Sequence, residues 1–443
     1  MQVVTQMMMV FMETPSFCSM ILKKTTDKAV LEVSQLFLKH RWTKASLNDT
    51  LKLMSSTLPE PNNMPQSLRM LCNYINASSA PCPEEPHYYC SHCFLVKVNK
   101  ADVCEHCGED KSGTFYVFSF ENQVKFLFEH QNLADAMDKY KEVCGTIDPE
   151  EKCLCDIPDG TEYKRVKKEA SGQYDIILML ATDGVSLSKS SDVKFYPVVT
   201  QICEVAPRLR SYFSMVNFVW VDEKPPDFNT VFETLSKELV NINEAGGVTW
   251  KHPKSGEIFK SRVFAPLLVG DAPVRADALK VMRFNAKYGC ENCEQKAKKL
   301  PPREGEKRSV RRFVFQEVPA AERTSERMRL QSIHAESENA VHCKGVKAGR
   351  AAIEKMPLLN RSTCTIAEYL HSALLGVTLF FTCKWFSIPG PWYIGRSRDA
   401  VDEFLTSIKV LDFMRDSRRI KDIARFKASE LRSWLLFYSL VVL

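Results

Sequence analysis

Two aspartates stand where a folded chain could use them for metal chemistry. Asp183 follows the apolar run YDIILMLAT, and Asp271 follows a second apolar run, VFAPLLVG. If both runs are buried strands, the carboxylates lie at strand ends, and a few such groups suffice to bind Mg²⁺ or Mn²⁺. Two of these ions, about 4 Å apart, stabilise the attacking and leaving oxygens of phosphodiester cleavage. The pattern indicates a metal-dependent nuclease core, although an aspartate before Gly184 also suits a simple turn.

Two cysteine pairs have the spacing of metal ligands rather than that of disulfides. Cys90 and Cys93 form one C-x-x-C pair, and Cys104 and Cys107 form another. Four thiolates can bind one Zn²⁺ tetrahedrally at about 2.3 Å, which stabilises a module too small to have its own core. We therefore predict a zinc ribbon at 82–118. It could contact nucleic acid or protein, or it could serve only as a folding staple.

The remaining cysteine usage favours a reducing compartment. The chain has 16 cysteines, and a third pair, Cys290 and Cys293, follows Asp271 by 19 and 22 residues. The N-terminal run MQVVTQMMMVFMETP lacks the positive region of a signal peptide and is interrupted by Glu13. Metal spacing without a secretion signal favours structural zinc over disulfides.

Hydrophobic periodicity predicts the elements that would position the aspartates. A nearly continuous apolar run predicts a central strand buried on both faces, and two further strands follow it. After KPPD, apolar residues at helical spacing predict an amphipathic helix that ends at Gly246-Gly247. A last strand leads to Asp271, so the order predicts a mixed sheet with a right-handed crossover. The predicted strands cover 174–181, 193–203, 215–221 and 263–269, and the helix stripe contains Phe228, Val231, Phe232, Leu235, Leu239 and Ile242.

The flanking regions differ in character from this core. Residues 1–80 look mainly helical, with a break at PEPNNMP (59–65) because proline removes a backbone donor. The segment 296–340 is charged, and its basic part could follow a phosphate backbone or could be a solvated linker. Its basic residues are Lys296, Lys298, Lys299, Arg303, Lys307, Arg308, Arg311 and Arg312.

Size and composition fit a globular protein of about three domains. The chain has 443 residues, of which 45% are hydrophobic and 26% charged, and its net charge is +6. This mild positive charge permits a nucleic-acid partner without demonstrating one. No segment reaches the roughly 20 apolar residues of a membrane span. The longest candidate, 370–383, contains His371 and is better explained as a buried core helix.

Several sequence blocks resemble the transposases of animal CACTA (En/Spm-like) elements. They include TDGVSLSKSSDVKFYPVVTQICEVAPRLR, VFAPLLVGDAPVRADALKVMRFNAKYGCENC, CKGVKAGRAAIEKMPLLN with EYLHSALLGV, WYIGRSRD and FKASELRSWLLFYSL. The resemblance covers roughly 150 to 443 and implies a DDE transposase with an RNase H-like fold. It implies that Asp183 and Asp271 are the first and second catalytic acids, and that Cys290 and Cys293 contribute to a zinc site. Their spacing after the second acid also resembles that of the V(D)J recombinase catalytic subunit.

The resemblance is incomplete at the third catalytic acid. The family implies a glutamate after a helical insertion, in a block similar to WGPLWAYSAFPFE preceded by zinc-binding histidines, and this chain contains no such block. The sequence ends in the apolar run 434–443, so we expect a C-terminally truncated transposase. Glu368 is the remaining candidate for the third acid, in a block where the family tends to have Asp-x-Met-His. His371 is more simply explained as a core residue.

These observations lead to one main hypothesis and one alternative. The first is a transposase-derived nuclear protein that binds DNA and is inactive without its third acid. The alternative is a non-enzymatic, zinc-containing DNA-binding or interaction protein. A compact RNase H-like exonuclease is disfavoured, a membrane partner is not expected, and a homo-oligomer is left open. The expected fold is α+β or α/β, with an N-terminal helical region (1–80), the zinc ribbon (82–118), a connecting segment (119–173), an RNase H-like mixed sheet (174–295), a charged linker (296–340) and a helical insertion (341–443).

Overall fold

The computed structural model describes most of the chain. The described residues are 25–40, 42–57, 62–78, 86–145, 156–186, 192–302, 309–409 and 417–442. The chain divides into two compact units, Met1–Leu268 with Pro273–Thr365 and Val269–Ala272 with Ile366–Leu443. The predicted chain break at 59–65 and the basic residues Arg303, Lys307 and Arg308 lie partly or wholly outside the described residues.

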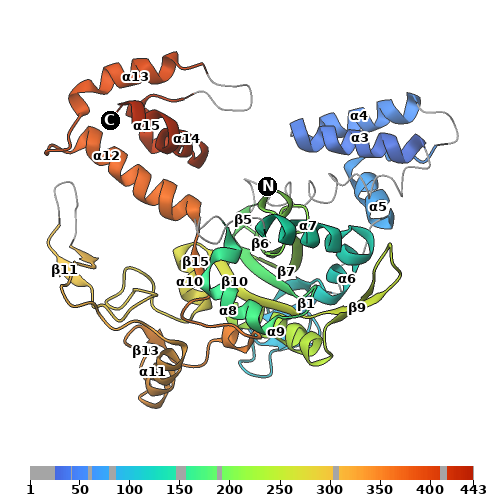
Figure 1. Cartoon of the computed structure of the whole chain (residues 1–443), viewed down its shortest axis with the longest axis horizontal. Coiled ribbons are helices and arrows are strands. Elements are labelled where there is room, and N and C mark those ends of the chain that lie inside the picture. The colour runs from blue at the N-terminus through green and yellow to red at the C-terminus, as the bar shows by residue number, and fades with distance from the viewer. Residues whose placement is uncertain are drawn as a thin grey trace. The chain divides into compact units, whose positions relative to one another are not determined.

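A mixed β-sheet is the main element of the described chain (Figure 1). From one edge to the other its strands are β15 (Thr365–Ala367), β10 (Val263–Gly270), β4 (Ile176–Thr182), β6 (Lys194–Ile202), β7 (Met215–Asp222), β3 (Ser112–Val117), β1 (His87–Cys90) and β2 (Val96–Lys97). The short β5 (Val185–Ser186) also pairs with β6. All neighbours from β4 to β2 are antiparallel.

Strands β4 and β10, in contrast, run parallel. The N–H of Ile176, the first residue of β4, donates to the carbonyl of Arg262, directly before β10, at 2.9 Å. Two paired strands that begin beside each other must run in the same direction. The chain between them includes further strands and a helix, and so it provides the long crossover that parallel strands require. The carboxyl ends of β4 and β10 therefore lie side by side, at the same end of the strands.

Helices cover both faces of the sheet. Ile176 and Leu178 of β4 belong to a core that includes Leu235, whereas Ile177 packs in a second core with Val166. Because alternate strand residues face opposite sides, β4 is buried on both faces, as its apolar run predicts. The helices are α6 (Phe120–His130) and α9 (Phe228–Glu244) on the first face and α8 (Thr161–Glu169) on the second; α7 (Leu133–Gly145) follows α6.

Helix α9 shows how the sequence sets the crossover before β10. Asp227 caps its start, because the side chain accepts hydrogen bonds from the N–H and hydroxyl of Thr230 at 2.9 and 2.8 Å. Its apolar stripe is buried. The helix is followed by Gly247, whose φ of +111° and close approach to the backbone of Ser261 exclude a side chain. The hairpin of β8 (Val248–Lys251) and β9 (Ile258–Ser261) then leads into β10.

The strands and the helix predicted around the two aspartates are confirmed. The predicted strands at 174–181, 193–203, 215–221 and 263–269 correspond to β4, β6, β7 and β10, and the predicted helix is α9. The mixed α/β sheet is likewise confirmed.

The cysteine module extends this sheet. Strand β3 pairs with β7 through Thr114 opposite Val221 and Val117 opposite Phe218. The ring of Tyr89, on β1, stacks on that of Trp220 at 3.8 Å. The sequence pattern predicts that residues 82–118 form a separate module. In the structure, the strands of this module share a hydrophobic core with the rest of the sheet.

Two segments expected to be connections contain regular structure. Residues 119–173 hold α6, α7 and α8. Residues 296–340 hold a hairpin of β11 (Lys298–Leu300) and β12 (Val310–Arg312), followed by α11 (Ser325–Ser337). Between β10 and β15 lie α10 (Ala272–Ala278) and the short hairpin of β13 (His342–Cys343) and β14 (Val346–Lys347).

The described residues of the N-terminal region and of the second unit are mainly helical. Helices α3 (Thr25–His40), α4 (Lys44–Thr57) and α5 (Leu68–Ser78) form a small core of their own. The second unit contains a π-helical segment (Leu370–Thr378), α12 (Leu379–Ser387), α13 (Arg398–Ser407), α14 (Ala428–Ser433), a π-helical turn (Trp434–Tyr438) and α15 (Ser439–Val442). The indole N–H of buried Trp434 donates to Thr382 at 2.8 Å.

The apolar segment 370–383 is buried on one face only. Leu374, Thr378 and Thr382 are buried, whereas the side chains of Phe380 and Phe381 are 49% and 46% exposed. The predicted buried core helix is therefore confirmed for one face of this segment and wrong for the other. No helix in the described part of the chain is long and apolar enough to cross a membrane.

Candidate metal centre

Cys90, Cys93, Cys104 and Cys107 converge into one cluster. Their Sγ atoms all lie within 4.8 Å of one another. The sulfur of Cys90 is 3.5 Å from that of Cys107, and the sulfur of Cys93 is 3.5 Å from that of Cys104. Tetrahedral coordination requires such spacing. The predicted four-cysteine site is confirmed as a cluster that could hold a metal ion such as zinc.

Two matching turns build the cluster. In the first, the N–H of Phe94 donates to the carbonyl of Cys90 at 2.9 Å; in the second, the N–H of Gly108 donates to Cys104 at 2.8 Å. Phe94 and Gly108 both have positive φ, +62° and +73°. Glycine adopts this conformation freely, whereas a phenylalanine is unusual there. Phe94 is held by packing, because its ring stacks on Tyr89.

The surroundings of two of the thiols favour the ionised form that a metal needs. The backbone N–H of Cys107 lowers the pKa of Cys104 to about 6. Burial alone would raise the pKa of Cys90, but the backbone N–H groups of Cys93 and His92 outweigh it and lower that pKa. The balance is reversed at the other two thiols. The backbone N–H groups of Leu95 and Glu109 lower the pKa values of Cys93 and Cys107, but burial and neighbouring thiols outweigh them and raise the pKa of Cys93 and, to about 12, that of Cys107.

The third cysteine pair does not form a comparable group. The sulfurs of Cys290 and Cys293 lie 3.4 Å apart, and burial raises the pKa of Cys293. Arg323 donates to the carbonyl of Cys290 at 3.0 Å. Within the described residues, no set of three or more potential ligands includes this pair. A second zinc site at Cys290 and Cys293 stays a prediction.

Asp183 and Asp271 follow directly on the parallel neighbours β4 and β10. Asp183 is exposed, and its Oδ1 accepts a hydrogen bond from the N–H of Gly184 at 2.7 Å. A side chain at Gly184 would meet the ring of Tyr196 at 2.7 Å, so glycine allows this turn. Asp271 is half-buried and directly precedes α10. Neither aspartate belongs to a group of three potential ligands in the described part of the chain.

Glu368 follows β15, the strand next to β10, but its carboxylate has a local role. Oε1 accepts a hydrogen bond from the N–H of Leu370 at 2.8 Å, and Oε2 accepts one from the N–H of His371 at 3.0 Å. Oε2 also lies 2.5 Å from Nδ1 of His371. Although burial alone would raise the pKa of Glu368, these donors lower it. The carboxylate therefore caps the helical segment that begins at Leu370.

A third aspartate at a strand end was not identified from the sequence. Asp222 ends β7 and accepts a hydrogen bond from the hydroxyl of Tyr89. Burial raises the pKa of Tyr196, and the charges of Asp222 and Asp183 raise it further. The signal was available, since Asp222 follows an apolar run just as the other two aspartates do.

No protein-family model matches the chain, and no curated protein matches its sequence.

Proposed function

We propose that this chain derives from a CACTA-like DDE transposase and that its sheet is an RNase H-like nuclease core. One observation carries the proposal: adjacent parallel strands, β4 and β10, each lead directly into an aspartate. In an RNase H-like transposase the strands before the first and second acids are neighbours. Asp183 and Asp271 would together bind Mg²⁺ or Mn²⁺, and the four-cysteine cluster would bind Zn²⁺.

The metal ion would act on DNA phosphates. In a complete transposase, an ion bound to the two aspartates would polarise the phosphodiester and lower the pKa of an attacking water. Asp183 is exposed, so its carboxylate is open to solvent. DNA is the expected partner, and the nucleus is the expected compartment because chromosomal DNA would be the substrate.

We further propose that the chain binds DNA but does not cut it. The second ion of the displacement needs another carboxylate. Glu368 would have to release the N–H groups of Leu370 and His371 before it could bind a metal. Losing hydrogen bonds from a charged acceptor costs about 1.5–3 kcal/mol each, which disfavours this change.

A non-enzymatic DNA-binding protein is the alternative function. The four-cysteine cluster and the basic hairpin β11–β12 favour it, because both would remain useful without cleavage. In this case Asp183 would only shape the turn at Gly184.

A cleavage and joining assay tests the proposed inactivity, and the Mn²⁺ affinity of an Asp183 variant distinguishes the metal-binding sheet from the non-enzymatic alternative. The purified protein is incubated with Mg²⁺ or Mn²⁺ and with DNA that carries the terminal sequences of the transposable element in which its gene lies. We expect binding of this DNA without nicking or joining. Mn²⁺-dependent cleavage that is lost in Glu368→Gln, with folding intact, would overturn the proposed inactivity. Failure of Asp183→Asn to change the Mn²⁺ affinity would argue against a metal site.

A further inference from the structure

The hairpin β11–β12 concentrates positive charge on both of its faces. Lys298 lies opposite Arg312, and Lys299 lies opposite Arg311. Successive strand residues point to opposite sides, so Lys299 and Arg311 lie on one face of the hairpin, and Lys298 and the half-buried Arg312 lie on the other. Directly opposed like charges destabilise a hairpin. Lys298, Lys299 and Arg311 are exposed, and no acidic residue in the described part of the chain pairs with them. An anionic partner from outside the chain would remove this repulsion.

Exposed aromatic side chains follow the second strand. Phe313 is 39% exposed and Phe315 is 92% exposed. Leaving a phenyl ring in water forgoes the free energy of its burial. Basic strands beside exposed aromatic rings are the combination by which proteins bind single-stranded nucleic acid, because bases stack on the rings while cations contact phosphates.

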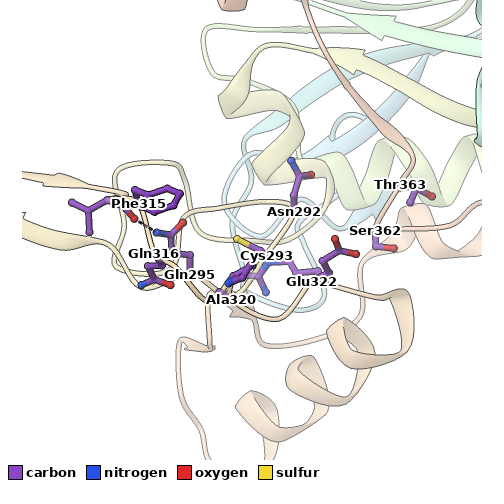
Figure 2. Close-up of a pocket in the computed structure, with 12 residues that line it drawn as sticks. Asn292, Cys293, Gln295, Phe315, Gln316, Ala320, Glu322, Ser362 and Thr363 are labelled. Atoms are coloured by element: carbon purple, nitrogen blue, oxygen red, sulfur yellow. Dashed lines mark hydrogen bonds between the residues drawn. The ribbon is translucent and has the colours of Figure 1, made fainter. Parts of the chain in front are cut away.

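A pocket of about 530 Å³ is lined in part by Phe315. Figure 2 shows Phe315 and Gln316 at one end, Ser362 and Thr363 at the other, and Cys293 between them. The side-chain amide of Gln295 donates to the carbonyl of Val314 at 2.6 Å. This hydrogen bond holds the segment after β12 against the wall of the pocket. The volume is within the usual range of small-molecule sites.

The lining groups suit the edge of a base. The amides of Asn292, Gln295 and Gln316 offer both donors and acceptors. Glu322 can accept from an exocyclic amino group, as carboxylates do with cytosine. Arg323 is 4% exposed and is held by the carbonyls of Cys290 and Lys344 at 3.0 and 2.8 Å, so it contributes rigidity and positive charge.

We infer that the cavity receives one unpaired DNA base, stacked against Phe315, while the β11–β12 hairpin contacts the phosphates of the same strand. The choice of DNA rests on the proposed function. The preference for an unpaired base goes beyond that function, and it follows from the rings and the cavity.

Fluorescence anisotropy with the full chain tests this inference without divalent metal. The probes are a fluorescein-labelled 20-nucleotide single strand that contains cytosine, its perfect duplex, and the same duplex with one bulged cytosine. We expect the single strand and the bulge to bind about 10-fold more tightly than the duplex, because base–aromatic stacking is worth about 1–3 kcal/mol per base. Equal affinity for all three probes would overturn the inference.

Two pairs of variants locate the binding surface. Phe315→Ala should weaken binding of the single strand and the bulge about 10-fold and leave the duplex unchanged, whereas Phe380→Ala, at a half-exposed phenyl of α12, should change nothing. Lys299→Gln/Arg311→Gln should weaken all probes and lower the salt slope for the single strand by about 1.4. The matched variant Lys251→Gln/Lys260→Gln removes the same charge from hairpin β8–β9 and should behave as wild type. Equal effects of both double variants would contradict the assignment.

The outcome separates this inference from the proposed function. Cleavage assays depend on Asp183 and Asp271, whereas these probes have no element ends and no metal. Binding that follows the hairpin and Phe315 supports the base site even if metal binding at the aspartates fails. Unchanged binding in these variants refutes the base site even if the aspartates bind Mn²⁺.

Discussion

The environment of some residues could be predicted from the sequence, whereas that of others could not. The four cysteines were predictable because ligands in a C-x-x-C turn are brought together by local backbone geometry. Glu204 was not predictable, since its burial comes from contacts with distant residues. Its carboxylate accepts hydrogen bonds from the hydroxyl of Tyr163 and the N–H of Ile177, both at 3.0 Å, and it is 8% exposed.

Glu204 should make the stability of the chain depend on pH. Burial raises its pKa from 4.5 to about 7, against the charge of Lys167 and the two hydrogen bonds. Between these values the folded state binds more protons than the unfolded state, so the free energy of unfolding falls as pH rises. We expect a loss of about 3 kcal/mol between pH 4.5 and 8 from this group, since each pKa unit corresponds to about 1.36 kcal/mol.

Urea unfolding of wild type and Glu204→Gln across that range measures the effect. The variant should lack this component and exceed wild type in stability at pH 8. Glu169→Gln, at an exposed glutamate nearby, serves as the control and should follow wild type. Parallel pH profiles for wild type and Glu204→Gln would contradict the predicted burial effect.

Helices and strands were predictable where one continuous segment contained all the residues that define the helix or strand. Helix α9 has a cap, a full apolar stripe and a glycine stop, and β4 and β10 are nearly all apolar. Strands β1 and β3 were not assigned to the sheet, because their partners lie far along the chain, as with Thr114 and Val221. Helix α6 was missed although Phe120, Val124 and Leu127 have helical spacing and are buried.

The cap of α9 gives a prediction at this scale. Asp227→Ala removes the acceptor of two hydrogen bonds from Thr230 and should destabilise the chain by about 1 kcal/mol. Glu244→Ala, at the last residue of the same helix, is the control. It should cost nothing or stabilise slightly, because a carboxylate at a helix C-terminus opposes the dipole. Chemical unfolding distinguishes the two, and equal loss of stability in both would argue against the cap.

At the scale of the whole molecule, the metal cluster and the sheet are coupled. Cys90 ends β1, which pairs with β3, which in turn pairs with β7. The rings of Tyr89 and Trp220 stack within the same core. Loss of the metal should therefore weaken the sheet and not only the two cysteine turns. The sequence could not predict this coupling, since it depends on pairing between distant strands.

Cys104→Ser tests the coupling. We expect the variant to lose one zinc per chain by atomic absorption and to lower the temperature of the main unfolding transition by several degrees, because metal-binding free energy contributes to folding. Cys144→Ser, at an exposed cysteine outside the cluster, should change neither quantity. An unchanged main transition with zinc lost would show instead that the module is energetically independent.

Mn²⁺ binding measured by electron paramagnetic resonance tests the central claim most directly. If Asp183 and Asp271 share one ion, Asp183→Asn and Asp271→Asn should each abolish the same single Mn²⁺ site. The double variant should lose no more than either single change. Asp399→Asn, at an exposed aspartate of α13, should retain the site. Full Mn²⁺ binding in either single variant, with the fold intact by circular dichroism, would contradict a shared site at the ends of β4 and β10.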